Sequence, residues 1–441
     1  MIPEFPSRDQ LIELVIFKSL HNHSNIFSIL VGKNGTGKST FLGNLTNHTV
    51  KEHYYRKKNN LFDEDNTSYF PQEIIAVSTS PFDKFPIERF EKNAHYTYLG
   101  LRDLQSSNFG LAYLSKIIAS LIESVSVEKS HAYEISRVLD YLGYRDEMLI
   151  NFQLFNSRKF FEDVIETDDL KDFFHRQSSI PIRRLNRAFF LNKNGTLSER
   201  KVTRLKEICN KIIKSDNYRS HFTLVLGKNG IDIDLHESED ILFLIQSGIL
   251  RLKDVRLESQ RENNHFSIKD ASSGEQSIIL SILGIASKIK DNSLIVIDEP
   301  EICLHPQWQE KYIEILTHTF QNYRNCHFII ATHSPQIISK LSNINSFIID
   351  MENGKTKDAY DFINNSVDYQ LANVFNSPGF KNEYLSRIAL NIFAKVSKRK
   401  YFDSDDLLNF ETIERQSKNL DTTDPVHDLY ITLKKMLKIY G

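Results

Sequence analysis

The run from Gly32 to Ser39, Gly-Lys-Asn-Gly-Thr-Gly-Lys-Ser, restricts the possible folds of this chain more than any other feature. It matches the pattern G-x-x-x-x-G-K-S, in which glycine backbone N–H groups surround phosphate oxygens and the next helix directs its positive dipole end at them. An apolar, β-rich run at 26–31 precedes it, and the pattern predicts a helix from about Lys38. The order of strand, loop and helix that a phosphate loop requires is therefore present.

The residues of this loop are the first candidates for a nucleotide site. Lys38 is expected to reach the β- and γ-phosphates, and the Ser39 hydroxyl is expected to bind Mg²⁺. The other candidate nucleotide-binding residues in this segment are Gly32, Asn34, Gly35, Thr36, Gly37 and Thr40.

A second element, the run Leu294–Glu299, ends a predicted strand with two adjacent carboxylates. Ligands of open α/β sheets bind at this end of the strands. Asp298 suits the outer shell of Mg²⁺, and Glu299 suits a base that polarises an attacking water. Alone, the two acids would be ordinary surface residues, but beside a phosphate loop they predict one phosphoryl-transfer site.

Two further segments carry candidate ligands of a nucleotide. Before an apolar helix predicted at 277–289, Ser272, Ser273 and Gly274 leave N–H groups that can hold an anion. A simple helix cap, with Glu275 in the first turn, is the alternative for this segment. His333 follows a predicted strand and could contact a γ-phosphate or a reacting water, although a lone histidine is more often structural.

The composition is that of a globular protein. Of 441 residues, 40% are hydrophobic and 25% charged, and the net charge of −2 means that a nucleic-acid or membrane partner must meet a local patch. No run approaches the ~20 apolar residues of a membrane helix, and the first residues lack a signal-peptide pattern. Three scattered cysteines suggest neither disulfides nor a metal cluster. A cytoplasmic protein without a membrane partner is expected.

Strands that alternate with helices predict an α/β fold with a mainly parallel sheet. We expect an N-terminal lobe at 1–104, an inserted helical region at 105–218, a C-terminal lobe at 219–362 and a helical region at 363–441. Between 162 and 172 there are six acids and one lysine, whereas the stretch from Arg183 to Arg219 has eleven bases and three acids. That stretch could bind a phosphate backbone, or it could form solvated helix faces balanced by the acidic run.

Together, the phosphate loop, the SSGEQ segment, the carboxylate pair and the histidine resemble the ABC-type ATPases. The resemblance implies an ABC-type P-loop head that uses ATP and Mg²⁺, with Glu299 as catalytic glutamate and His333 as switch histidine. It also implies a homo-oligomer, at least a dimer, in which Ser273 and Gly274 of one chain complete the site that holds Lys38 of the other.

Departures from the transporter pattern indicate a branch of this family. The run 298–306, Asp-Glu-Pro-Glu-Ile-Cys-Leu-His-Pro, is similar to the RecF- and OLD-like ATPases. No glutamine occupies the Q-loop position, where the chain has Ser78–Asp83. OLD-like proteins end in a nuclease domain, but helix capping explains Asp403 and Asp405 better than a metal site does.

Within this branch the motifs and the helical tail are most similar to the PtuA family, the ATPases of Septu anti-phage systems, also found beside retrons. That resemblance implies a regulatory or scaffold subunit whose nucleotide state controls an associated HNH nuclease. A RecF-like DNA-repair ATPase and a PARIS-like sensor that traps another effector are the alternatives.

Overall fold

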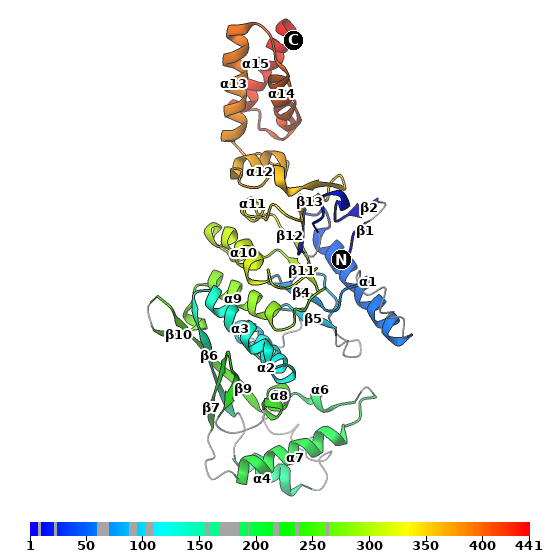
Figure 1. Ribbon diagram of the computed structural model, residues 1–441, viewed down its shortest axis with the longest axis vertical. Helices are drawn as coiled ribbons and strands as arrows, with labels where there is room; N and C mark the ends of the chain where they lie inside the picture. The colour runs from blue at the N-terminus through cyan, green and yellow to red at the C-terminus, as the bar shows by residue number, and fades with distance from the viewer. Residues whose placement is uncertain are drawn as a thin grey trace. The chain divides into compact units, whose positions relative to one another are not determined.

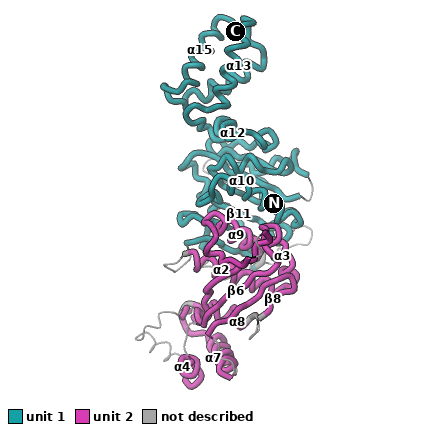
Figure 2. Tube along the Cα trace, turned by 90° about the vertical axis from the view of Figure 1, so that its left-hand side faces the viewer, with its two compact units in different colours: residues 1–103, 289–441 teal, residues 104–288 magenta. Residues whose placement is uncertain are grey.

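The computed structural model divides the chain into two compact units, residues 1–103 with 289–441 and residues 104–288 (Figure 2). The inserted unit interrupts the other one in sequence, and each unit has its own sheet. The described residues are 1–7, 10–21, 24–59, 70–87, 95–102, 109–154, 158–167, 185–192, 194–214, 220–233, 238–261 and 264–441.

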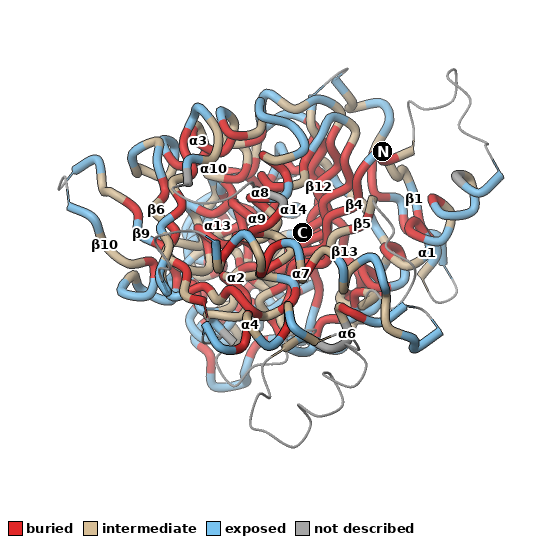
Figure 3. Tube along the Cα trace, turned by 90° about the horizontal axis from the view of Figure 1, so that it is seen from below, coloured by how far each residue is buried: buried red, intermediate tan, exposed pale blue. Residues whose placement is uncertain are grey.

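The first unit is built on a seven-stranded sheet with the order β14-β13-β3-β12-β11-β4-β5 (Figure 1). All neighbouring strands pair in parallel except β13 and β14. The central strands are buried on both faces, which explains their continuous apolar runs (Figure 3). The predicted α/β class with a mainly parallel sheet is therefore confirmed. The strands are β3 Ile26–Val31, β4 Ile74–Ser78, β5 Tyr96–Leu99, β11 Leu294–Asp298, β12 His327–Ala331, β13 Ser346–Asp350 and β14 Lys355–Asp358.

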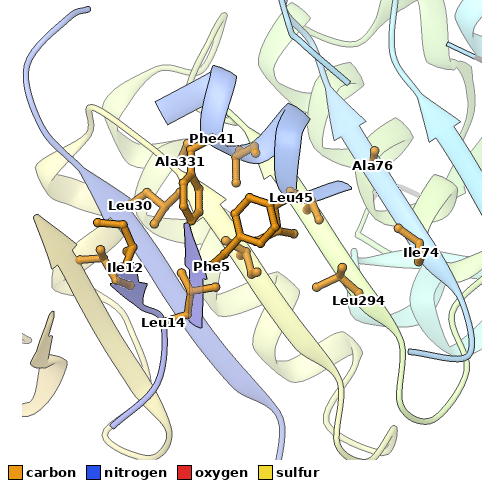
Figure 4. Packing of buried hydrophobic residues seen from close by; sticks show 14 of the residues in the cluster. Phe5, Ile12, Leu14, Leu30, Phe41, Leu45, Ile74, Ala76, Leu294 and Ala331 are labelled. Carbon is orange, nitrogen blue, oxygen red and sulfur yellow. The ribbon is translucent and has the colours of Figure 1, made fainter. Parts of the chain in front are cut away.

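Helix α1 packs on this sheet and forms one hydrophobic core with an N-terminal hairpin. Phe5 of the hairpin contacts Phe41 of α1 edge to face, with ring centroids 5.5 Å apart (Figure 4). Leu30 and Ala331 from neighbouring strands belong to the same cluster. The core thus holds the start of α1, and with it the end of the phosphate loop, against the strands. The elements are β1 Glu4–Ser7, β2 Gln10–Glu13, the 3-10 turn η1 Phe17–Ser19, α1 Lys38–Lys58, α10 Pro306–Thr319 and α11 Pro335–Ser339.

The second unit contains an antiparallel sheet with the order β10-β9-β6-β7-β8. Its longest strand, β6, lies within 105–218, where the sequence predicted only helices. Alternate residues of β6 are buried, so its apolar periodicity is two rather than helical. The Asn229-Gly230 pair, a sequence typical of a tight hairpin turn, lies where β7 and β8 join as an antiparallel hairpin. The strands are β6 Tyr144–Leu154, β7 His221–Gly227, β8 Gly230–Ile233, β9 Leu250–Ser259 and β10 His265–Ser267.

Helix α2 holds a long apolar segment of the second unit. Among the described residues, Gly110–Val127 is the single helical window long and apolar enough to cross a membrane, and half of it is buried in the unit. Helix α2 packs against α8 and α9, so core packing explains its composition. The remaining elements are α2 Phe109–Val127, α3 Ser130–Tyr141, α4 Arg158–Glu166, α6 Arg187–Phe190, α7 Glu199–Lys214, α8 Ser238–Gln246, the 3-10 turn η3 Ile268–Asp270 and α9 Ser273–Ala286.

The C-terminal part of the first unit is helical, as the sequence predicted. Its helices pack around a hydrophobic cluster of their own, which includes Leu385, Phe410 and Leu433. Asp403 caps α14 in a capping box with Asp406, which confirms that capping accounts for this acidic segment. The elements are η4 Ala359–Asp361, α12 Val367–Asn373, α13 Glu383–Arg399, α14 Ser404–Gln416, η5 Ser417–Asn419 and α15 Pro425–Tyr440.

Candidate functional site

The phosphate loop lies between the end of β3 and the start of α1. Gly32, Gly35 and Gly37 have φ values of 148°, 83° and 94°, which L side chains rarely adopt. A Cβ placed on Gly35 would meet nothing within 4 Å, so space is open in front of the loop. This backbone therefore needs glycine at three positions and leaves room for a ligand.

The side chain of Lys38 folds back over its own loop. Its Nζ donates hydrogen bonds to the carbonyl oxygens of Gly32 at 2.9 Å and Lys33 at 3.3 Å. Burial lowers the pKa of Lys38, while Glu299 and other nearby acids oppose that shift. Of the other candidates in this segment, Thr36 donates to the Lys33 carbonyl, and Asn34 and Thr40 are exposed.

Ser39 and Asp298 connect the phosphate loop to the end of β11. Ser39 Oγ donates to Asp298 Oδ1 at 3.1 Å, although the two residues are 259 positions apart in sequence. Asp298 is only 1% exposed. Burial raises the pKa of Asp298 to about 7, and the negative charge of Glu299 contributes. The predicted metal-site pair, a hydroxyl and a carboxylate, is therefore brought together.

Glu299 and His333 lie at the ends of adjacent parallel strands, β11 and β12. The Glu299 N–H donates to the Ala331 carbonyl at 2.9 Å, and Glu299 has a φ of 49°. His333 Nε2 lies 3.7 Å from Glu299 Oε1. Burial and the charge of Lys38 lower the pKa of His333 to about 4, so the imidazole is neutral at pH 7. The two predicted catalytic side chains thus face each other without forming a salt bridge at neutral pH.

Glu301 is a site residue that sequence reasoning did not single out. Its Oε1 accepts a hydrogen bond from the backbone N–H of His333. Its Oε2 is buried and has no hydrogen-bond partner among the described residues. Burial raises the pKa of Glu301. The only sequence signal was its place in the run that follows Asp298, where nothing indicated which backbone it would meet.

The segment that replaces the Q-loop is held by its own hydrogen bonds. Asp83, 1% exposed, accepts from the Tyr98 hydroxyl at 2.7 Å and from Arg102 Nε at 3.1 Å. Ser78 Oγ accepts from the Ser80 N–H at 3.0 Å. Because Asp83 is committed to these partners, its carboxylate is not free to take the role of the missing glutamine.

The SSGEQ segment lies in the second unit, at the start of α9. Ser272 and Glu275 form a capping box: Ser272 N–H donates to Glu275 Oε2 at 3.0 Å, and Glu275 N–H donates to Ser272 Oγ at 3.3 Å. The helix cap that the sequence offered as the alternative is therefore present at these two residues. Ser273 and Gly274 begin the helix, and their N–H groups belong to the first turn, which has no partner within the helix.

The charges at the end of β11 suit a divalent cation. Asp298, Glu299 and Glu301 all act electrostatically on Lys38, the cation among them. These three carboxyl groups outnumber the one ammonium group, but burial raises the pKa of both Asp298 and Glu301, and no group of three or more acidic, histidine or cysteine side chains in the described residues is placed to hold a metal alone. Carboxylate and hydroxyl oxygens are hard ligands of the kind that Mg²⁺ binds, and Ser39 adds a hydroxyl next to Asp298.

The basic stretch is partly neutralised within the chain. On α7, Lys211 Nζ lies 2.9 Å from Asp240 Oδ2, and Arg204 pairs with the other oxygen of that buried carboxylate. Arg183 and Arg219, which bound the predicted stretch, lie outside the described residues, as do Asp168, Asp169 and Asp172 of the acidic run.

Residues 109–339 match the protein family described as "AAA domain, putative AbiEii toxin, Type IV TA system". The chain belongs to this family. The matched segment includes the SSGEQ segment, Asp298, Glu299 and His333, and the phosphate loop lies before it.

The chain is also similar to three curated proteins. It is 25% identical to the "Retron Ec83 probable ATPase" of Escherichia coli over 381 residues, covering 73% of this chain and 66% of the relative. It is 21% identical to the "Protein ea59" of Escherichia phage lambda over 321 residues, covering 70% and 46%. It is 28% identical to the "Retron Vc95 probable ATPase" of Vibrio cholerae serotype O1 biovar El Tor over 94 residues, covering 19% and 18%. The chain spans less than two thirds of the length of each relative.

Solved structures of SMC heads show weak likeness. The SMC head domain from Thermotoga maritima is 15% identical with a TM-score of 0.19, covering 31% of this chain and 68% of that one. An SMC head bound to the C-winged helix domain of ScpA is 12% identical with a TM-score of 0.25, covering 77% and 90%. Scores this low do not establish a shared fold, and the α/β class rests on the sheet order itself.

Proposed function

We propose that this chain binds and hydrolyses ATP with Mg²⁺. The observation that carries the proposal is the 3.1 Å hydrogen bond between Ser39 Oγ and Asp298 Oδ1, with Lys38 within their electrostatic reach. This arrangement joins a phosphate loop to a buried carboxylate at the carboxyl edge of a parallel sheet. The family membership and two relatives named "probable ATPase" support the same activity.

In this proposal, each residue of the site has a role that agrees with its position in the structure. The loop N–H groups and Lys38 bind the β- and γ-phosphates, and Ser39 with Asp298 holds the metal. When bound, Mg²⁺ neutralises charge on the phosphate oxygens. Glu299 accepts a proton from the attacking water, and the neutral His333 orients the γ-phosphate or that water.

We propose further that ATP holds two copies of the chain together. The first turn of α9 carries the backbone N–H groups of Ser273, which is exposed, and Gly274, which is buried in this single chain. Such a helix start favours an anion. Ser272 and Glu275, which cap each other, would then shape the helix start while Ser273 and Gly274 contact the γ-phosphate bound by the second copy.

The biological setting that we propose is anti-phage defence in the cytoplasm. The chain would act as a PtuA-like regulatory subunit whose nucleotide state controls an HNH nuclease. The two retron-associated relatives support this setting. The RecF-like alternative has less support, because Asp240 already neutralises Arg204 and Lys211 of the basic stretch. Salt-sensitive DNA affinity that is lost on charge reversal of Arg183, Arg184 and Arg187 would favour that alternative.

Phosphate release and particle mass test the ATPase proposal. Glu299→Gln should lower kcat at least about 100-fold, because it removes the general base. The same variant should still bind ATP and should show an ATP-dependent dimer by light scattering. Glu314→Gln, an exposed acid on α10, is the matched control and should turn over normally. Undiminished turnover by Glu299→Gln would overturn the assignment.

Co-expression with the neighbouring gene product tests the defence proposal. A nuclease that co-purifies with the chain, and whose activity changes with nucleotide, is the expected result. A chain that hydrolyses ATP but captures no nuclease would leave the ATPase standing and reject the PtuA-like role.

A further inference from the structure

The proposed catalytic pair is divided between two turns. Glu299 belongs to the turn between β11 and α10, and His333 belongs to the turn between β12 and α11. Their side chains are 3.7 Å apart, so a small shift of either turn would separate them. The backbone bond from Glu299 N–H to the Ala331 carbonyl connects the two strand ends, but it precedes His333 by two residues.

Glu301 supplies a connection at His333 itself. It lies two residues after Glu299, and its carboxylate accepts a hydrogen bond from the His333 backbone N–H. Two backbone hydrogen bonds hold the turn that contains Glu301. The Ile302 N–H donates to the Glu299 carbonyl at 3.2 Å, and the Leu304 N–H donates to the Glu301 carbonyl at 2.9 Å. One side chain therefore spans the two turns that carry the catalytic pair.

Gln309 of α10 supports the same pair of turns from the other side. Its Nε2 donates to the Leu304 carbonyl at 2.9 Å, and its Oε1 accepts from Ser334 Oγ at 2.7 Å. Gln309 thus connects the residue after His333 to the turn that contains Glu301. The His333 turn is therefore held at two consecutive residues by side chains from the neighbouring turn and helix.

Burying a carboxylate to make this contact costs more free energy than burying a neutral acceptor would. A buried charged group costs free energy unless it is well paired. The Thr332 side chain interacts with the Glu301 carboxylate and lowers its pKa, but Glu301 Oε2 has no hydrogen-bond partner of good geometry among the described residues. Glu301 also lies near Asp298 and Glu299, which repel it. In return, the charge-assisted hydrogen bond from the His333 N–H is stronger than a bond to a neutral acceptor, so the carboxylate holds this turn more firmly than an amide oxygen would.

We propose that Glu301 is a positioning residue that keeps the His333 side chain close to the Glu299 carboxylate. The inference rests on the proposed ATPase function and adds a residue that acts through His333 instead of touching the substrate. Its carboxylate holds the backbone of His333, and this sets the distance between the imidazole and Glu299. Loss of the contact would let the turn move and would slow the chemical step without weakening ATP binding.

Steady-state kinetics of four variants test this role. Glu301→Ala should lower kcat about 10- to 100-fold and leave the KM for ATP within about threefold, since small misplacements near the chemistry cost about that much. Glu301→Gln keeps an oxygen that accepts the His333 N–H and should recover kcat to within about fivefold of the wild type. The double variant Glu301→Ala/His333→Ala should be no slower than His333→Ala, because coupled residues are not additive.

A structural readout and a matched control complete the test. Hydrogen exchange of the peptide covering 327–339 should be faster in Glu301→Ala and near normal in Glu301→Gln, since the bonded group is the His333 N–H. Glu314→Ala, which removes an exposed acid 3.9 Å from Lys340, should leave kcat and this exchange unchanged. Equal thermal midpoints and equal binding of a fluorescent ATP analogue would show that Glu301→Ala folds.

Several outcomes would overturn the inference. They are an unchanged kcat in Glu301→Ala, a rise in KM with kcat unaffected, or losses that multiply in the double variant. In each of these cases the wild type still turns over, so the proposed ATPase activity survives. A wild-type chain that binds ATP but never hydrolyses it would instead reject the ATPase proposal, and the positioning role with it.

Discussion

Ser39 Oγ of α1 lies 3.1 Å from Asp298 Oδ1 of β11 and donates a hydrogen bond to it. The contact joins two segments from opposite halves of the chain, because β11 and β3 are both neighbours of β12 in the parallel sheet. It places a metal-binding hydroxyl beside a buried carboxylate.

Lys38→Ala should weaken binding of ATP itself. Lys38 is the buried cation of the loop, whereas Lys33 is exposed. Loss of one charged hydrogen bond costs about 1.5–3 kcal/mol, so the Kd should rise at least about tenfold. Titration with a fluorescent ATP analogue measures this change. Lys51→Ala, an exposed lysine further along α1, is the control and should bind normally. Equal affinities for all three proteins would contradict the role given to the loop.

Affinity for Mg²⁺ should fall in mild acid. Burial raises the pKa of Asp298 to about 7, and the metal binds the ionised carboxylate, so protons compete with it below that pH. Between pH 8 and pH 6 the ionised fraction drops, and Mg²⁺ should bind about tenfold more weakly. Calorimetric titration in two buffers of different ionisation enthalpy should also show proton release near pH 6. Binding that is independent of pH, with no proton released, would exclude Asp298 as the coupled group.

The buried His327 should make the fold sensitive to acid. Its Nδ1 accepts from the Ile2 N–H at 3.2 Å and its Nε2 contacts Ser28 Oγ at 2.8 Å, so the neutral ring satisfies both partners. Burial lowers its pKa well below 6.5. Its contribution to stability is therefore complete above about pH 6.5 and is lost below it, at about 1.4 kcal/mol per pH unit.

Urea unfolding at pH 7.5 and pH 5.5 measures this loss. His327→Gln should show a smaller difference in free energy of unfolding between the two pH values, because it removes the titrating group. If the variant and the wild type lose the same stability in acid, His327 is not responsible.

The acids at the start of α14 should contribute to stability and have no part in nuclease chemistry. Asp406 is 1% exposed, accepts from the Asp403 N–H, and lies 3.2 Å from Lys395 Nζ, so Asp406→Ala should cost about 1–3 kcal/mol. Asp405 is exposed, and Asp405→Ala should leave the urea midpoint unchanged. Mg²⁺-dependent DNA nicking that disappears in Asp405→Ala would show instead that these acids bind metal.

Several local features could be predicted from the sequence because they depend on neighbours along the chain. The glycines at 32, 35 and 37 are required by backbone angles within the loop itself. The cap at Asp403 and the turn between β7 and β8 likewise involve residues close in sequence. The continuous apolar runs before Lys38 and Asp298 indicated buried parallel strands, and the sheet confirms them.

Other features depended on which segments meet in space. The role of Glu301 required knowing that β11 and β12 are adjacent, since only then does its carboxylate reach the His333 N–H. The assignment of 105–218 as helical overlooked β6, whose partners β7 and β9 lie far along the chain. Strand pairing of this kind leaves a weak local signal, because the neighbouring strands supply the partners for its ladder hydrogen bonds and much of its burial.

The sequence by itself determined the phosphate loop, the carboxylate pair that ends β11 and the caps, because backbone sterics and hydrogen bonds between near neighbours decide these. Only the tertiary structure decided how Asp298, His333 and Glu301 behave. Their pKa values are shifted chiefly by burial, and burial is a property of the packed sheet and turns. The same packing set the 3.7 Å separation of Glu299 and His333, which no spacing along the chain could specify.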